Sequence, residues 1–311
     1  MNVSHLLRRY EQGEIDFSGV DLSGADLGGA ILIGVNLSRA NLAGANLTRA
    51  FLSRVKLNGA NLQRANLSFA KMNEAKLVDA DLTKANLNGA FLVKAKLPGA
   101  RLSGASLAGS NLRRASLPNA NLSGANLQFA NLREANLTGA DLRWANFYGV
   151  RLSGAKLFGT KLTDINLQNA YLNGVNLSRL DLNGVNLSEA RMCGSNLSGT
   201  QLNYANLSRA QLRGVCLQGA DLTAANLEGA CLTWANLNSA KLSRTNFQDA
   251  DLQNATLAGA QVEETDFCRA TLPDSFRLYL DLEKICSCTP YHPENSEMSR
   301  SQFYNRIEKM L

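Results

Sequence analysis

The chain has 311 residues, of which 45% are hydrophobic but only 6% aromatic, and its formal net charge is +6. Too few large side chains are present for a conventional globular core of this length, so we expect one long, thin core of small and medium residues. No apolar run is long enough for a membrane-spanning helix and no signal-peptide core is present, so we expect no membrane span, no export and a cytoplasmic location.

Residues 1–14 carry the pattern of a short amphipathic helix. Val3, Leu6, Leu7 and Tyr10 recur at helical spacing before Gly13. We predict an N-terminal capping helix, because an uncovered end of a β-structure exposes unpaired backbone groups.

Residues 15–274 repeat every five residues, a period that neither an α-helix nor a β-strand accommodates. From Phe17 to Leu272 there are 52 consecutive repeats with a hydrophobic central residue, which is Leu in 45 of them. A helix would turn successive central residues by about 140° and scatter them, and a strand would place them on alternate faces. A backbone that turns a corner in each repeat, always in the same sense, sends every central residue inward.

A second period, of four repeats, separates the sides of this coil. The residue before the centre, taken in every fourth repeat from Asp26 to Asp266, is almost always Asn or Asp. The next column, which begins with Ile31, Phe51 and Lys71, has no such uniformity. Four walls per turn and 52 repeats predict about 13 coils.

Each corner consists of the two residues that follow a centre. Pro98-Gly99 and Pro118-Asn119 are typical of the two middle positions of a type II turn, which require a φ of about −65° and then a positive φ. Where the second corner residue is Arg114, Phe129 or Trp144, we expect a different turn type, because such residues disfavour positive φ.

The A(D/N)LxG repeats resemble the pentapeptide-repeat family, and the opening LLRRYEQGEIDFSGVDLSGADL resembles its cyanobacterial members. This resemblance covers about 256 residues and implies an all-β solenoid, a right-handed quadrilateral β-helix. It implies little about function, because a repeat scaffold serves many tasks.

Catalytic and metal-binding constellations are not predicted. The two histidines, His5 and His292, lie outside the repeats, so no Ser-His pair or His-rich site can form on the coil. Recurring carboxylates such as Asp21 and Asp81 follow the repeat pattern rather than a sheltered acid–base pair. Cys286 and Cys288 form only a Cys-x-Cys pair, and reduced thiols are favoured over a metal site. We therefore expect no enzyme activity and no cofactor.

Positive charge is concentrated in one segment. Residues 39–161 contain 18 basic and 5 acidic residues, a net charge of +13, whereas residues 162–274 have a net charge of −4. Lysines four repeats apart should stack on one wall, and like charges about 5 Å apart repel each other. An anionic partner would relieve this repulsion, and the alternative interpretation is a solvated face that keeps the protein in solution.

Beside this basic segment lies a group of apolar residues that the coil would leave outside. Such a group, edged by cations, is typical of a contact surface, although aromatic stacking between coils is the competing interpretation. A smaller aromatic group, Phe129, Trp144 and Tyr148, is better explained as a stacking ladder. The predicted partner-binding residues are Ile31, Ile33, Phe51, Arg54, Lys56, Lys71, Lys76, Phe91, Val93, Lys94, Lys96 and Arg114.

Residues 275–311 are predicted to form a C-terminal cap and a helical tail. Ser299 and Gln302 have the spacing of a capping box, and Phe303, Ile307 and Met310 share one face of the helix that would follow. That face needs a partner, either the coil or another chain, so both a monomer and a dimer through the tail stay open.

Three functions are compatible with the sequence. The first is a non-enzymatic protein-interaction scaffold that binds an acidic and apolar protein surface. The second is binding of nucleic acid or another anionic surface through residues 39–161. The third, DNA mimicry that modulates topoisomerase, is implied by some members of the similar family, but it requires an acidic coil and is disfavoured by the net positive charge.

Overall fold

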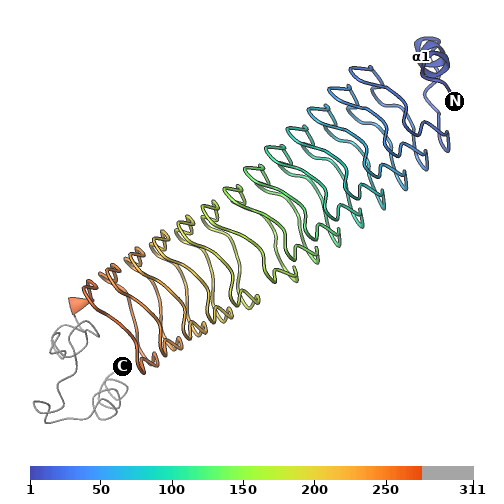
Figure 1. The fold of residues 1–311 in the computed structure, drawn as a ribbon. Helices are drawn as coiled ribbons and strands as arrows, with labels where there is room; N and C mark the ends of the chain where they lie inside the picture. The colour runs from blue at the N-terminus through green and yellow to red at the C-terminus, as the bar shows by residue number, and fades with distance from the viewer. Residues whose placement is uncertain (275–311) are drawn as a thin grey trace, which may run out of the picture. The chain divides into compact units, whose positions relative to one another are not determined.

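The computed structural model describes residues 1–274, and the predicted C-terminal cap and tail at 275–311, with Cys286 and Cys288, lie outside them (Figure 1). The chain divides into two compact units, Met1–Asn166 and Leu167–Leu311. Within the described part of both units, the backbone repeats one five-residue conformation. No helix in residues 1–274 has the length and apolar character needed to cross a membrane.

Helix α1 spans Val3–Glu11 and precedes the first coil (Figure 1). Its N-terminus is capped by Asn2, whose side-chain oxygen accepts a hydrogen bond from the His5 N–H at 2.8 Å. Leu6 is fully buried, and the Tyr10 hydroxyl donates to the carbonyl of Ile33 at 3.3 Å. The helix is therefore held by one apolar anchor and by a contact with the coil.

Successive coils are joined by parallel bridges between residues that are four repeats apart. In the first unit Asn46 bridges to Asn66 and Lys56 to Lys76, and in the second unit Asn206 bridges to Asn226. The β-structure consists of these isolated bridges, one in each repeat, rather than of longer strands. The predicted wall period of four repeats is thus confirmed within each unit.

The repeat around Leu127 shows how the backbone is satisfied. The Leu127 N–H donates to the carbonyl of Asn146 at 2.8 Å, and the Asn146 N–H donates to the carbonyl of Ala125 at 2.9 Å. Ala130 closes the corner by donating to the Leu127 carbonyl at 3.0 Å. Each wall of this coil thus binds the next coil through its main chain, as a parallel sheet does.

Central residues point inward along the whole described coil, as predicted. From Phe17 to Leu272 none exposes more than 4% of its surface. Burying a leucine side chain contributes about 1.5–3 kcal/mol, so the central column supplies the main stabilising term of the fold.

The Asn and Asp residues before the centres cap the corners. Asn126 Oδ1 accepts from the Gln128 N–H at 3.1 Å, a turn that Asn and Asp side chains make more strongly than Ser or Thr. Neighbouring coils extend this pattern, since the Asn46 amide donates to Asp26 Oδ1 at 2.7 Å. These two bonds explain why the Asn column predicted from the sequence is so uniform.

The expected change of turn type at bulky second corner residues is wrong. Arg114, Phe129 and Trp144 have φ of 59°, 58° and 58°, in the left-handed region, as has every second corner residue from 19 to 269. A left-handed residue costs about 1–2 kcal/mol, but the Phe129 N–H donates to the Tyr148 carbonyl at 2.9 Å, and the corner and Asx bonds add to this. The hydrogen bonds of the coil outweigh the preference of the single residue.

Candidate protein-interaction surface

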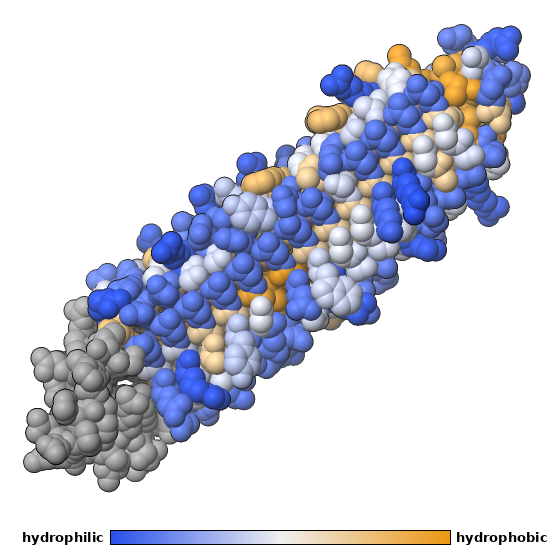
Figure 2. Space-filling model, in the orientation of Figure 1, coloured by the Kyte–Doolittle hydropathy of each residue, from blue (hydrophilic) through white to orange (hydrophobic). Residues whose placement is uncertain are grey.

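The apolar column is the set of bridged wall residues Ile31, Phe51, Lys71 and Phe91. Ile31 is 56% exposed and Phe91 43% exposed, whereas Phe51 is half-buried. Because wall residues alternate with buried ones, these side chains point away from the core. Figure 2 shows hydrophobic atoms on the surface near the end of the chain that carries α1.

Lys71 interrupts the apolar column but contacts it. Its ammonium Nζ lies 4.1 Å from the centroid of the Phe51 ring, within the range of a cation–π interaction. Phe51 therefore takes part in a contact between coils, as the stacking interpretation expects, while Ile31 and Phe91 remain exposed. The stacking interpretation therefore fits Phe51, and the contact-surface interpretation fits Ile31 and Phe91.

The basic corner follows the apolar column and comprises the first corner residues Ile33 and Val93 with the second corner residues Arg54, Glu74 and Lys94. Ile33 and Lys94 are exposed, and Val93 is half-buried. Arg54 Nε lies 3.5 Å from Glu74 Oε2, an ion pair between two exposed side chains that contributes little to stability. One carboxylate thus partly neutralises this corner.

The lysine column is the set Lys56, Lys76 and Lys96 on the wall after the basic corner. The three residues are joined by consecutive parallel bridges, which confirms that they stack on successive coils about 4.8 Å apart. All three side chains are exposed. Within residues 1–274, no carboxylate forms an ion pair with these lysines or with Lys94.

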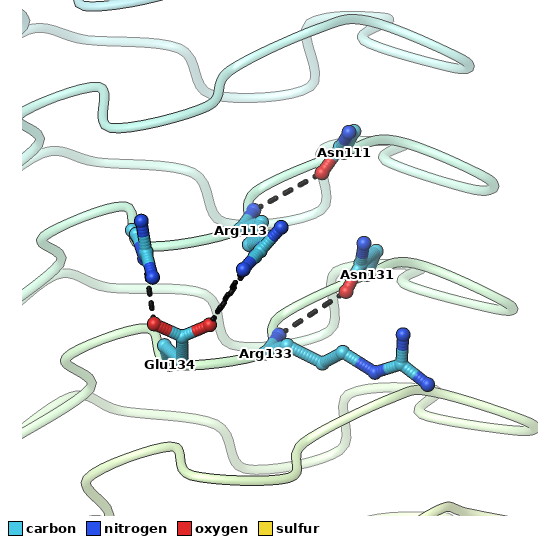
Figure 3. A network of polar contacts seen from close by, with 6 residues as sticks. Asn111, Arg113, Asn131, Arg133 and Glu134 are labelled. Carbon is cyan, nitrogen blue, oxygen red and sulfur yellow. Dashed lines mark hydrogen bonds and ion pairs between the residues drawn. The ribbon is translucent and has the colours of Figure 1, made fainter.

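Arg114, the last residue predicted for the surface, lies on the same corner one coil beyond Lys94 and is part of an ion-pair cluster. Figure 3 shows Glu134 between two arginines of the preceding coil: Arg114 Nε lies 2.6 Å from Glu134 Oε2, and Arg113 Nη2 lies 3.0 Å from Oε1. Hydrogen bonds from Arg114 and then Arg113 lower the pKa of the Glu134 carboxyl below its usual value. Arg114 is therefore already paired, unlike the lysines. Glu134 follows Arg114 by four repeats, and this spacing is the sequence signal for the pairing.

Phe69 was missed by the sequence prediction, although it lies on the corner just before Lys71. It is 52% exposed, and the Arg49 guanidinium lies 6.0 Å from its ring centroid. A Cβ at Gly89 would lie only 2.5 Å from the Phe69 ring, so the ring in this position packs against the space that glycine leaves. An aromatic corner residue followed by Gly four repeats later is the signal that identifies such a ring.

The second aromatic group only partly forms a ladder. The Phe129 and Tyr148 rings meet edge to face, with centroids 5.3 Å apart. Trp144 lies on the preceding corner, where its indole Nε1 donates to Asp164 Oδ2 at 3.1 Å. The predicted stacking is thus confirmed for Phe129 and Tyr148 but is wrong for Trp144, because its corner faces a different wall.

The carboxylates on the walls act as turn caps. Asp21 Oδ1 accepts from the Ser23 N–H at 3.0 Å, and this backbone bond is the main reason that the pKa of Asp21 is lowered. A carboxyl group with a lowered pKa stays ionised and is a poor general acid. Among the described residues, no group of three His, Cys, Asp or Glu side chains has an arrangement that could hold a metal ion.

The five-residue repeat, the bridges between repeats four apart and the capped corners agree with one protein family. The profile described as Pentapeptide repeats (8 copies) matches residues 21–59, 60–99, 95–128, 125–164, 160–199, 194–229 and 230–269. The chain belongs to the pentapeptide repeat family. Proteins of this family form right-handed quadrilateral β-helices, in keeping with the four walls per coil.

Solved structures of pentapeptide repeat proteins are similar to this chain. HetL, a protein involved in heterocyst differentiation regulation in the cyanobacterium Nostoc sp. strain PCC 7120, is 32% identical over 88% of this chain and 98% of its own, with a TM-score of 0.24. The Nostoc protein alr5209 is 34% identical over 35% of this chain and 80% of its own, with a TM-score of 0.25.

A third similar structure comes from a plant. AT2G44920 from the Arabidopsis thaliana thylakoid lumen is 29% identical over 39% of this chain and 85% of its own, with a TM-score of 0.35. No curated protein matches the chain. The TM-scores are low, so membership in the family rests on the sequence match and on the repeat geometry.

Proposed function

We propose that this pentapeptide repeat protein is a non-enzymatic scaffold that binds a protein partner through the apolar column, the basic corner and the lysine column. The partner surface that fits these residues is acidic and apolar. The observation that carries the proposal is the adjacency of two columns of different chemistry. Exposed Ile31 and Phe91 lie on one wall, and Lys56, Lys76 and Lys96 lie on the next, with Lys94 on the corner between them.

Energetics favour a partner over solvent for both columns. The exposed side chains of Ile31 and Phe91 leave apolar area in water, and removal of such area on binding contributes about 25 cal/mol per Å². Neighbouring lysines about 5 Å apart repel each other by about 0.8 kcal/mol per pair in water, and a carboxylate facing them offsets this repulsion. The charges should therefore raise the association rate and the specificity for an acidic partner, and apolar burial should supply affinity.

Loss of the apolar contact provides the test. Phe51→Ser with Phe91→Ser should weaken recovery of the partner by the tagged protein in low salt and in about 0.5 M salt alike, since apolar burial is little screened. Phe129→Ser, at an exposed ring outside the surface, is the control and should recover the partner normally. Equal recovery by all three proteins would contradict the proposal.

Binding of nucleic acid or another anionic surface is the second candidate, and the net charge of +13 in residues 39–161 supports it. A duplex held by phosphate contacts would show a steep loss of affinity with salt and hardly respond to the two Phe changes. Titration of the protein with a DNA duplex at several salt concentrations separates the candidates. DNA mimicry remains disfavoured, because it requires an acidic coil.

Three broader expectations belong to the same proposal. The unbroken five-residue register supports about 13 coils. The free cysteines of the described residues, Cys193, Cys216, Cys231 and Cys268, support a reducing cytoplasmic location. A scaffold that acts by binding requires no cofactor and no catalytic residue. The oligomeric state depends on the tail at 275–311, which lies outside the described residues.

A further inference from the structure

We infer that the element recognised by this surface is an acidic amphipathic α-helix of the partner, lying along the direction in which the coils stack. The inference rests on the proposed function and specifies the partner. It follows from the spacing of the contacts, from their chemistry and from the positions of the cations.

If each coil contacts one residue of the partner element, spacing favours a helix over an extended chain. The apolar column places Ile31, Phe51, Lys71 and Phe91 on four successive coils, so three steps of about 4.8 Å span about 14 Å. Three turns of an α-helix rise about 16 Å, whereas three same-face steps of an extended strand rise about 20 Å. The helix stays in register with the column to within about 2 Å, which flexible side chains can accommodate.

Chemistry determines which residues the helix must present. Its contact stripe faces Ile31 and Phe91, with the half-buried Phe51 and then Lys71 between them. It therefore has to be apolar at i, i+3 or i+4, and i+11, while position i+7 faces Lys71. Lys71 already lies over Phe51, so the centre of the stripe tolerates one carboxylate without an unpaired charge.

Cations flank the apolar column on both sides. Arg49 lies on the corner before it, and Lys94 and Arg54 lie on the corner after it. Lys94 has no ion pair among the described residues, while Arg54 is shared with Glu74. A helix whose apolar stripe is bordered by Glu or Asp matches this arrangement, and a helix bordered by Lys is repelled. The surface thus selects for the sign of the charge as well as for the spacing.

Binding of labelled peptides to the full chain tests the inference. The probes are peptides of about 18 residues, or five helical turns, with Leu at helical spacing and Glu on both borders, in several registers of Glu against Leu. Two further sets have the same composition with strict alternation of Leu and Glu, or have Lys in place of Glu. Fluorescence anisotropy measures the affinity of each for the wild type and for two charge-reversed proteins.

The matched variants carry the same changes on different corners of neighbouring coils. Arg54→Glu with Lys94→Glu alters the surface, and Arg64→Glu with Lys84→Glu alters exposed second corner residues on another corner. The best helical peptide should bind at least about tenfold more tightly than the alternating and Lys peptides. Only the first variant should remove that preference.

Each other outcome overturns the helical inference. Equal binding of helical and alternating peptides, equal loss in the two variants, or no binding of any helical register would each contradict it. If Phe51→Ser with Phe91→Ser still weakens recovery of the partner, the proposed function is supported even though the helical inference fails. Failure of the proposed function and failure of the helical inference are therefore distinguished.

Discussion

The ammonium of Lys71 lies 4.1 Å from the centroid of the Phe51 ring on the neighbouring coil. The two residues share one parallel bridge, so the contact is set by the period of four repeats rather than by a local turn. The pair ties a basic residue to the apolar column, whereas the neighbouring lysine column forms no ion pair within residues 1–274. Phe51 and Lys71 thus contact each other within the coil, whereas the exposed Ile31 and Phe91 are available to a partner.

The Lys71–Phe51 contact should be measurable as a coupling. In a double-mutant cycle, Lys71→Met keeps the aliphatic stem, and Phe51→Leu keeps an apolar wall residue. We expect a coupling free energy of about 0.5–1 kcal/mol from denaturant unfolding, the size of an exposed cation–π pair. Strictly additive effects would show that the ammonium and the ring do not interact in solution.

Leu127→Lys should abolish the cooperative unfolding transition or lower its midpoint strongly. Leu127 is fully buried, so an ammonium there has no partner and no water, and we expect a loss of several kcal/mol. Gln128→Lys, on the outward neighbour, is the control and should change little. Thermal melts followed by circular dichroism provide the measurement, and an unchanged melting temperature for Leu127→Lys would contradict the inward assignment.

Arg64→Gly should stabilise the protein by about 1 kcal/mol. Arg64 has a φ of 56° and an exposed side chain, so glycine removes the cost of a left-handed residue. Gly124→Ala is the reciprocal control, because an added Cβ there meets nothing within 4 Å and only the backbone is strained. Denaturant unfolding should show opposite signs for the two changes; the same sign for both would refute this account of the corners.

Acid should remove the stabilisation that Asp141 provides. Hydrogen bonds from Arg143, with Nη2 2.6 Å from Asp141 Oδ2, lower the pKa of Asp141 below its usual value of about 3.9. A lowered folded-state pKa means that the stabilisation is complete above the usual value and is lost as the pH falls through the folded one. Asp141→Asn keeps the turn-capping oxygen but loses the charge.

Melting temperatures against pH test this assignment. Asp141→Asn should melt slightly below the wild type at neutral pH, and the two curves should converge in acid. The difference should be small, because the pair is partly exposed. A gap between the curves that is constant at every pH would show that the charge of Asp141 has no role.

Much of the fold could be predicted from the sequence, because the same five-residue pattern recurs in 52 consecutive repeats. The inward position of Leu127 and the bridge between Lys56 and Lys76 follow from the periods of one repeat and four repeats alone. The left-handed corner at Phe129 could not be predicted in this way, since residue preference was weighed without the hydrogen bonds of the neighbouring coil.

The candidate surface was predictable in outline but not in its pairing. Stacking of Ile31 on Phe51 and of Lys76 on Lys96 follows from the column spacing. The pairing of Arg114 with Glu134 carried a signal in the four-repeat spacing, but the prediction grouped Arg114 by its charge alone and did not consider its neighbour on the next coil. Exposed Phe69 was missed because the prediction covered the apolar column and the corner after it, whereas Phe69 lies on the corner before that column.

Recovery of the partner by two charge-reversed proteins tests the central claim most directly. Arg54→Glu with Lys94→Glu and Arg64→Glu with Lys84→Glu lower the net charge equally and replace the same residue types at the same corner position. Both proteins should keep the circular dichroism of the wild type, because the four residues are exposed. In low salt, the account predicts that the first protein loses the partner and the second retains it. Equal recovery by both, or equal loss from both, would contradict a binding surface on this side of the coil.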